Sequence, residues 1–133
     1  MRVVVHVDGG ARGNPGPAAV AAVVSDPDGT VLDEAAQRIG TATNNVAEYR
    51  AVLLGIERAR ALGATELELV NDSELVARQL QGVYKVKHPA MRPLHLDAMT
   101  SLRGFERWSI RPVRREENAH ADALVNQALD EAA

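Results

Sequence analysis

Near its N-terminus the chain reads Arg2-Val-Val-Val-His-Val-Asp8, an apolar run of β-branched residues that ends on a carboxylate. Valines on both faces of an extended segment are typical of a strand covered on both sides, so Val3 to Asp8 is predicted to be a buried strand. The next segment, Gly9 to Pro17, is rich in glycine and proline and is predicted to be a loop. An acidic side chain is therefore expected where a buried strand gives way to a loop.

The segments after this loop predict the rest of a mixed sheet. Asp26-Pro-Asp-Gly29 has the composition of a hairpin turn, because proline presets φ and glycine accepts a positive φ. The βββαβααβα order predicts an α/β fold with a five-stranded mixed sheet flanked by helices, in which hairpins are followed by crossover connections. The expected elements are strands 18–25 and 30–39, helix 46–62, strand 66–70, a helix opened by residues 71–74 and closed by Gly82, helix 94–102, strand 108–113 and a helix capped by Asn118.

The composition is that of an ordinary globular chain. With 46% hydrophobic and 25% charged residues, positions 1–133 are expected to form a single domain. The absence of cysteine excludes disulfides, thiolate zinc sites and cysteine nucleophiles. The acid at position 8 interrupts the apolar run too early for a signal peptide, and the longest apolar stretch, Ala18 to Val24, is too short to span a bilayer. We therefore expect a cytoplasmic protein without a membrane partner.

Four carboxylates, Asp8, Glu48, Asp72 and Asp122, occupy comparable places in the expected elements. Each lies at a strand end, at a helix start or on the margin of an apolar helix stripe. Four acids that converge from distant segments would repel one another strongly unless divalent cations neutralise them. The net charge of −3 argues against a nucleic-acid partner until two such ions are counted, because −3 + 4 gives +1. The pattern therefore indicates a metal site.

Each acid also has an ordinary structural interpretation. Asp8 precedes a glycine, as turn residues often do, although small neighbours would also let a phosphate backbone approach it. Glu48 in a first turn favours the helix dipole, and Asp72 suits a helix cap. Asp122 borders the stripe of its helix and would be either half-exposed or directed into a site. Other sites fit less well, because the Gly-rich loop lacks a P-loop ending and the histidines lack zinc-ligand spacing.

Four strings around these acids resemble the four motifs of ribonuclease H type 1. They occur in the family's order and spacing and cover nearly the whole chain. The resemblance implies the ribonuclease H fold and hydrolysis of the RNA strand in RNA/DNA hybrids, leaving 5′-phosphate and 3′-hydroxyl ends. The strings are Asp8-Gly-Gly-Ala-Arg-Gly-Asn-Pro-Gly-Pro17, Thr43-Asn-Asn-Val-Ala-Glu-Tyr49, Asn71-Asp-Ser-Glu-Leu-Val76 and Arg115-Glu-Glu-Asn-Ala-His-Ala-Asp122.

The resemblance also implies a cofactor. Two Mg²⁺ ions, or Mn²⁺ in their place, would be held by the catalytic acids Asp8, Glu48, Asp72 and Asp122. Asp8 would bridge both ions, and the other three would complete the shells. Carboxylate oxygens are the hard ligands that such ions take, and the ions would serve two-metal hydrolysis of the RNA strand.

Substrate contacts are implied by the same motifs. Asn14, Asn44 and Asn45 match positions that read the minor groove of the hybrid, where amides can both donate and accept. Thr43 matches a residue of a pocket for a DNA-strand phosphate. Asn44 and Asn45 also suit a helix cap, and the two roles can coexist.

The chain departs from some family members in two places. Residues 112–117 hold no histidine, and His120 is expected on the last helix, so no histidine is given a catalytic role. Arg114 and Glu117 are candidates to replace it in part. Residues 82–93 form only a short basic stretch without tryptophan, so weak and salt-sensitive hybrid binding is expected.

Two other hypotheses stay open. A non-catalytic module that binds RNA/DNA hybrids would not need four repelling carboxylates. A related nuclease of the same fold, such as a transposase or a Holliday-junction nuclease, would not need the asparagines that favour RNA recognition. The leading expectation is a monomer whose partner is an RNA/DNA hybrid.

Overall fold

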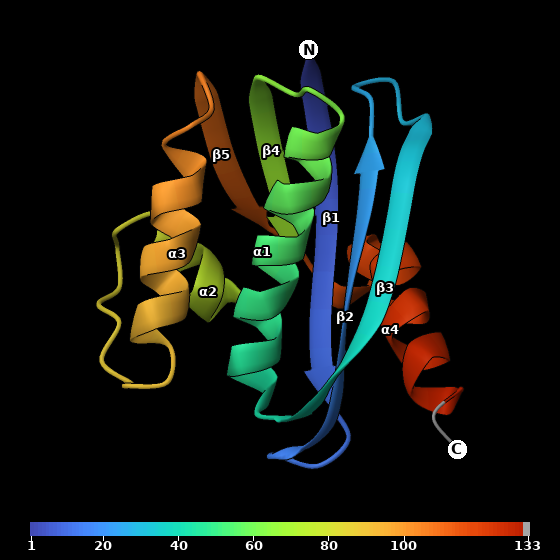
Figure 1. Ribbon diagram of the computed structural model, residues 1–133, viewed down its shortest axis with the longest axis vertical. Coiled ribbons are helices and arrows are strands. Elements are labelled where there is room, and N and C mark those ends of the chain that lie inside the picture. Colours follow the sequence, from blue (N-terminus) through green and yellow to red (C-terminus); the bar gives the residue numbers. More distant parts are fainter. Residues whose placement is uncertain (132–133) are drawn as a thin grey trace.

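The computed structural model describes residues 1–131, and positions 132–133 of the expected domain lie outside the described part. Its elements confirm the predicted order of strands and helices (Figure 1). A single 3₁₀ turn, η1, is added before the last helix. The elements are β1 Arg2–Ala11, β2 Gly16–Ser25, β3 Val31–Ala42, α1 Asn44–Ala61, β4 Glu66–Asn71, α2 Glu74–Leu80, α3 Arg92–Leu102, β5 Arg107–Pro112, η1 Arg115–Asn118 and α4 Ala119–Asp130.

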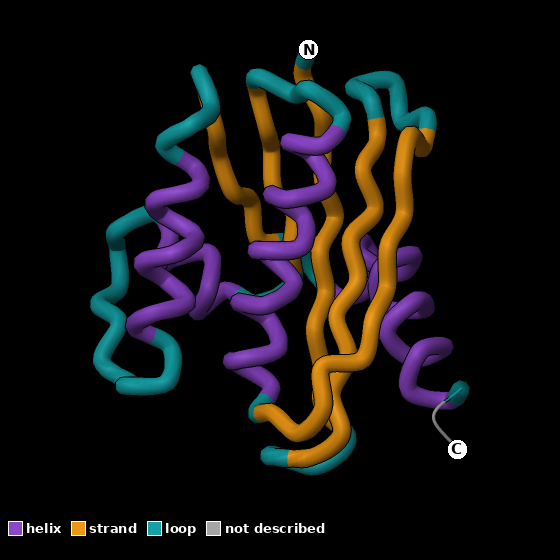
Figure 2. The backbone as a smooth tube through the Cα atoms, in the orientation of Figure 1, coloured by secondary structure: helices purple, strands orange, loops and turns teal. Residues whose placement is uncertain are grey.

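The five strands form one mixed sheet in the order β3-β2-β1-β4-β5. The pairs β1–β2 and β2–β3 are antiparallel, whereas β4 and β5 run parallel to β1. Helix α1 carries the chain from β3 to β4, and α2 and α3 carry it from β4 to β5, as Figure 2 shows. β1 is therefore the central strand, with an antiparallel neighbour on one side and a parallel neighbour on the other.

Helices cover both faces of the sheet. α1 and α3 lie on one face, and α4 lies on the other, behind β1, β2 and β3 (Figure 1). α1 packs closely on β1 because Gly55 has no side chain: a Cβ there would lie 2.6 Å from Val7 Cγ1 and 3.0 Å from Val5 Cγ1. Valines at odd positions of β1 therefore face α1, and even positions face the side of α4.

β1 is longer than predicted, and the difference positions the site. The predicted strand ended at Asp8, but β1 continues to Ala11 because β2 pairs with it as far as Ala11↔Ala18. The parallel pairing with β4 stops earlier, at His6↔Val70. Asp8 therefore lies inside a strand that has just lost one of its two neighbours.

Two predicted helix caps have different roles in the structure. α2 is capped by Ser73, whose hydroxyl accepts a hydrogen bond from Val76 N at 3.3 Å, so the carboxylate of Asp72 is not used as the cap. Asn118 precedes α4 but makes no side-chain cap bond; its Nδ2 donates to Val7 O at 2.8 Å. This buried bond ties the start of α4 to the central strand.

The end of one edge strand was predicted closely, and the end of the other was not. β5 is an edge strand that ends at Pro112, as the proline indicated. β3, at the other edge, runs to Ala42, three residues beyond its predicted end. Among residues 1–131, no helix combines the length and the apolar character needed to cross a membrane.

Candidate active site

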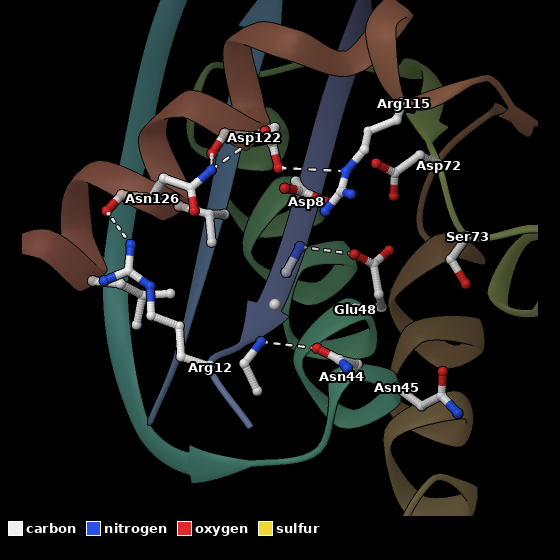
Figure 3. A pocket seen from close by; sticks show the side chains of 15 residues that line it. Asp8, Arg12, Asn44, Asn45, Glu48, Asp72, Ser73, Arg115, Asp122 and Asn126 are labelled. Carbon is white, nitrogen blue, oxygen red and sulfur yellow. Dashed lines mark hydrogen bonds and ion pairs between the residues drawn. The ribbon is translucent and has the colours of Figure 1, made fainter. Parts of the chain in front are cut away.

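A cleft lies where the pairing of β1 with β4 ends. Its walls come from β1, the first turn of α1, the segment after β4, and α4 (Figure 3). Asp8, Glu48, Asp72 and Asp122 all line it, although they come from four separate elements of the chain. The structure thus brings the four predicted acids to one place, while their catalytic and metal-binding roles remain predictions.

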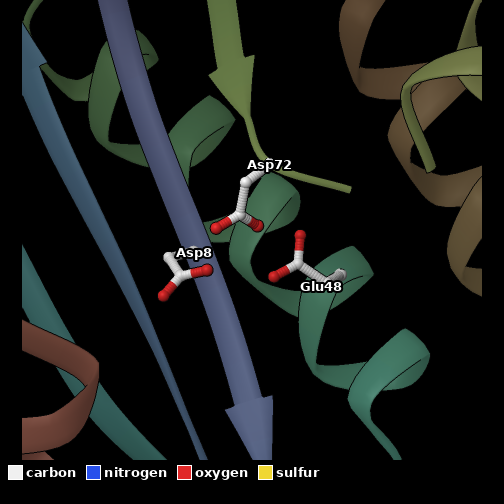
Figure 4. Close-up of side chains that lie close together, drawn as sticks. All are labelled: Asp8, Glu48 and Asp72. Carbon is white, nitrogen blue, oxygen red and sulfur yellow. The ribbon is translucent and has the colours of Figure 1, made fainter. Parts of the chain in front are cut away.

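Three of these acids lie close enough to share a cation. Asp8, Glu48 and Asp72 each offer a carboxylate oxygen, and these oxygens lie within 4.8 Å of one another. Figure 4 shows the three carboxylates gathered between β1, α1 and the end of β4. Asp8 and Glu48 are buried, only 5% and 6% exposed, and Asp72 is half-buried. Acids so close and so poorly hydrated repel one another unless they are protonated or neutralised.

Glu48 reaches Asp8 although the two residues belong to different layers. Asp8 occupies an even position of β1 and faces away from α1, but β4 no longer flanks the strand here. Gly9 lets the first turn of α1 approach, because a Cβ at this position would lie 2.2 Å from Ala47 O. Gly9 was expected to make room for a phosphate backbone; instead it makes room for the helix that carries Glu48.

The two oxygens of the Glu48 carboxylate have unequal surroundings. Oε1 accepts a hydrogen bond from Gly9 N at 2.9 Å. Oε2 is buried and has no hydrogen-bond partner among residues 1–131. A buried carboxylate oxygen without a partner is costly, and a cation among the three acids would satisfy it.

Burial and mutual repulsion raise the pKa values of the cluster. The pKa of Asp8 is raised to about 7, first by burial and then by the charge of Asp72. Burial, followed by the charge of Asp8, holds the pKa of Glu48 well above its usual range. Burial also raises the pKa of Asp72, and the nearby Arg115 guanidinium opposes this shift. A divalent ion would reverse these shifts by favouring the ionised carboxylates.

Asp122 stands at the border of the cluster, on the first turn of α4. Its side chain is 31% exposed, and Arg115 Nε lies 4.0 Å from its Oδ1. Asn126, one turn along the helix, donates from Nδ2 to Asp122 Oδ2 at 3.4 Å and to its carbonyl oxygen at 3.2 Å. Arg115 and Asn126 therefore contact Asp122 from two sides. Asp122 lies next to the three-acid cluster, but its carboxylate is not among the oxygens that lie within 4.8 Å of one another.

Of the predicted substrate residues, Thr43, Asn44 and Asn45 lie at the start of α1, and Asn14 lies on the turn between β1 and β2. Asn44 and Asn45 line the cleft. Thr43 is the actual cap of α1, because its Oγ1 accepts a hydrogen bond from Val46 N at 3.2 Å. The capping role considered for the two asparagines therefore belongs to Thr43, and both amides are free of that function.

Hydrogen bonds fix the orientation of two of the amides. Asn44 Oδ1 accepts from Ala11 N at 2.9 Å, and Asn14 Oδ1 accepts from Asn44 N at 3.1 Å. Both acceptor oxygens are thus engaged with the protein backbone. Their Nδ2 groups make no hydrogen bond within residues 1–131 and remain as donors for a ligand.

Sequence reasoning missed the cation nearest the acids. Arg115 lines the cleft, whereas Arg114, which was considered as a replacement for a histidine, pairs with Glu116 and Glu117 at 3.8 and 3.5 Å. Arg114 and Arg115 are adjacent in the sequence, so the path of the backbone through η1 decides which side chain faces the acids. His120 is on α4, as expected, and pairs with Glu34 of β3 at 2.5 Å.

The chain is similar in sequence to a known protein family and to known proteins. A family model described as "Reverse transcriptase-like" matches residues 6–128. The "Bifunctional protein Rv2228c" of Mycobacterium tuberculosis is 49% identical to the chain over 134 residues. That match covers all of the chain but only 37% of the mycobacterial protein. The chain therefore spans little more than a third of the length of this curated relative.

Solved structures match over the full domain. The crystal structure of RNase H1 from Halobacterium salinarum has a TM-score of 0.96 and 45% sequence identity, covering 98% of this chain and 99% of that one. The structure of LC11-RNase H1 in complex with an RNA/DNA hybrid has a TM-score of 0.94 and 41% identity, covering 98% of each chain. The observed sheet order and helix placement agree with both.

Proposed function

The chain belongs to the ribonuclease H type 1 family, and from this premise we propose that it is a metal-dependent endoribonuclease that cleaves the RNA strand of RNA/DNA hybrids. The observation that carries the proposal is the buried cluster of Asp8, Glu48 and Asp72, with carboxylate oxygens within 4.8 Å of one another. The solved complex of LC11-RNase H1 with an RNA/DNA hybrid supports the choice of substrate.

The residues fit a pair of divalent ions. The donor set is made of carboxylates, the hard ligands that Mg²⁺ and Mn²⁺ take. The partnerless Oε2 of Glu48 and the raised pKa values of the three acids show a site whose charges need compensation. Asp8, Glu48, Asp72 and Asp122 would hold the ions, which when bound supply activation of water and stabilisation of the leaving oxygen.

The proposed reaction is a hydrolysis. A water oxygen forms a bond to the scissile phosphorus, the P–O3′ bond breaks, and the proton from water ends on the leaving oxygen. The products are a 5′-phosphate and a 3′-hydroxyl. The contribution of the chain is to hold four carboxylates on rigid elements, so that the phosphate is positioned with little reorganisation.

Recognition of the hybrid is proposed for the residues at the start of α1 and for Asn14, on the turn between β1 and β2. Because the amide oxygens of Asn14 and Asn44 are engaged internally, these side chains would donate to acceptors in the minor groove, such as base-edge oxygens and 2′-hydroxyls. Asn45 is exposed beside them. The Thr43 hydroxyl accepts from the helix and so keeps its proton for a DNA-strand phosphate.

We propose that the positive charge of Arg115 stabilises the negative charges in the cleft. Its guanidinium faces Asp122 and lowers the pKa of Asp72, which burial alone would raise further. A cation here would keep the two acids ionised and stabilise negative charge on the phosphate during cleavage. This assigns to Arg115 the part that was considered for Arg114.

The test is cleavage of an end-labelled RNA/DNA hybrid with Mg²⁺ or Mn²⁺, with and without a chelator. Asp72→Asn should remove cleavage, because it deletes one carboxylate of the cluster without changing its size. Asp28→Asn, on the exposed hairpin turn, is the matched control and should cleave as the wild type does. An inactive wild type, or full activity of Asp72→Asn, would refute the proposal.

The same experiment separates the alternatives. Tight hybrid binding without cleavage would identify a non-catalytic binding module. Equal cleavage of duplex DNA would identify a related nuclease of the same fold. Sequencing the ends of the products checks the predicted 5′-phosphate and 3′-hydroxyl.

A further inference from the structure

Two arginines line the cleft: Arg115 lies among the carboxylates, between Asp122 and Asp72, and Arg12 lies apart from them, beside Asn126 (Figure 3). Arg115 faces Asp122, at 4.0 Å. Arg12 comes from the turn between β1 and β2, and its one ion pair among residues 1–131 is with Asp130. The four acids and two arginines of the lining carry −4 and +2, so two divalent ions would leave the cleft at +2.

The position of Arg12 is fixed at both the backbone and the side chain. Its backbone N–H donates to Pro17 O at 2.8 Å, and the chain folds tightly around it, because a Cβ on Gly16 would lie 2.1 Å from Arg12 O. Its Nη2 donates to Asp130 Oδ1 at 2.6 Å and to Asn126 O at 3.5 Å. The guanidinium is therefore held against the C-terminal half of α4, at the rim of the cleft.

The anchoring leaves most of the guanidinium unused. Both hydrogen bonds come from Nη2, and Nε and Nη1 have no hydrogen-bond partner within residues 1–131. The side chain is 49% exposed. A guanidinium offers five donors in a planar fork that matches the oxygens of a phosphate, and a fork held in place loses less entropy on binding.

We propose that Arg12 binds a phosphate of the RNA strand next to the scissile one, on the side of the cleft toward the end of α4. The inference rests on the proposed function, because the scissile phosphate must lie at the acids. The strand is the RNA strand because Arg12 lines the same cleft as those acids. In the absence of substrate the guanidinium is held by Asp130, whose carboxylate competes with the phosphate for it.

A purely structural role for Arg12 makes a different prediction. In that case its pair with Asp130 would only fasten the β1–β2 turn to α4, and removing either partner would have the same result. Asp130 is 67% exposed, and pairs of this kind stabilise proteins by about 0–1 kcal/mol, so neither variant should unfold the protein.

The test compares Arg12→Ala, Arg12→Lys and Asp130→Asn in steady-state cleavage of a hybrid over a range of salt concentrations. Arg12→Ala should raise KM about 3- to 10-fold, change kcat less than about 2-fold, and reduce the salt slope of log KM by about 1. Arg12→Lys should fall between, because it keeps the charge and loses the fork. Asp130→Asn should lower KM, because it removes a charge that competes with the phosphate while an amide oxygen can still accept from the guanidinium. Arg103→Ala, an exposed arginine at the end of α3, is the control.

The contacted phosphate can be located with hybrids that carry one uncharged methylphosphonate linkage beside the cleavage site. For the wild type, one position in the RNA strand should raise KM, and this sensitivity should vanish in Arg12→Ala, because the two changes remove the same contact. The inference is overturned if Asp130→Asn raises KM as much as Arg12→Ala does, or if Arg12→Ala matches the wild type. If the wild type does not cleave, the proposed function fails, and the dissociation constants of the same variants for the hybrid decide the role of Arg12 separately.

Discussion

The two halves of β1 are both extended strand, but the first stabilises the fold and the second positions the acid cluster. In the first half, the strand pairs with β4 over Arg2 to His6 and with β2 from Val4 onward, and Val3 and Val5 are completely buried. In the second half, Asp8 to Ala11, only β2 remains as a neighbour, and the residues are an acid, two glycines and an alanine. Apolar burial in the first half stabilises the fold, whereas the second half places a buried acid beside two others, which opposes folding.

The site therefore forms where the pairing of β1 with β4 stops and β1 continues. Where β4 stops, the central strand is exposed on one side, and side chains from both helical layers can meet there. The half of β1 with two strand neighbours then supports the half that has only β2 beside it. Three pairs of variants and one pH experiment can test this division.

The largest effect is expected from substituting one residue in each half of β1 and comparing the two variants. Asp8→Asn should lower kcat for hybrid cleavage on the order of 10³-fold, because one ligand charge is lost from the cluster. Val5→Ala should leave kcat within a few-fold and lower the free energy of unfolding by about 2 kcal/mol through the cavity it creates. Single-turnover cleavage and urea unfolding measure the two quantities. A Val5→Ala variant that is stable but inactive would contradict the division.

A substitution at the border between strand and helix should affect both quantities. Gly9→Ala places a Cβ 2.2 Å from Ala47 O, so α1 must move and Glu48 moves with it. We expect a loss of about 2–4 kcal/mol in stability and of about 10- to 100-fold in kcat. Gly10→Ala is the matched control, since its nearest neighbour would be Val125 Cγ1 at 3.9 Å. Equal behaviour of the two variants would show that the approach of α1 to Gly9 is not needed.

A smaller effect is expected at the cation beside the acids. Arg115→Ala should lower kcat about 10-fold, because the guanidinium facing Asp122 is removed, which corresponds to about 1.4 kcal/mol. Arg114→Ala should have little effect, because this arginine pairs with Glu116 and Glu117 instead. The ratio of the two kcat values measures the difference, and a ratio near one would remove Arg115 from the proposed mechanism.

The smallest effect concerns stability against pH in the metal-free protein. The pKa of Asp8 is raised to about 7 in the fold, so between about pH 4 and 7 the folded state binds more protons than the unfolded state. Stability should therefore fall as pH rises through this range, by about 1–3 kcal/mol. Asp8→Asn should flatten the dependence and be more stable than the wild type at pH 8. Urea unfolding in chelator at pH 5 and pH 8 gives the answer, and a stability that rises with pH would contradict it.

Periodicity and turn composition were sufficient to predict the order of elements, because each has a strong local signal. The boundary at Asp8 was predicted too early, because the loss of a neighbour strand depends on where β4 ends, 63 residues along the chain. Asn118 has the residue type of a helix cap, but the tertiary structure competes for its side chain: Nδ2 donates to Val7 O, and Oδ1 accepts no hydrogen bond among residues 1–131. Such competition is decided by tertiary contacts that local sequence does not contain.

The site was predicted from the strings around the acids, whereas its cations were not. The acids have distinctive neighbours in the sequence, but Arg114 and Arg115 are adjacent and chemically identical. Only the path of the backbone through η1 decides which of them faces Asp122. The roles of the four acids, of Asn14, Thr43, Asn44 and Asn45, and of the two ions stay predictions, as do the monomeric state and the cytoplasmic location.

The hydrogen bond from Gly9 to Glu48 fixes the direction of this carboxylate. With Oε1 accepting from the backbone amide, Oε2 is the oxygen left without a hydrogen-bond partner among residues 1–131. A cation bound among the three acids would meet this oxygen first. One backbone amide of the central strand thereby orients a side chain of α1, and the orientation of the acid is set before any ion binds.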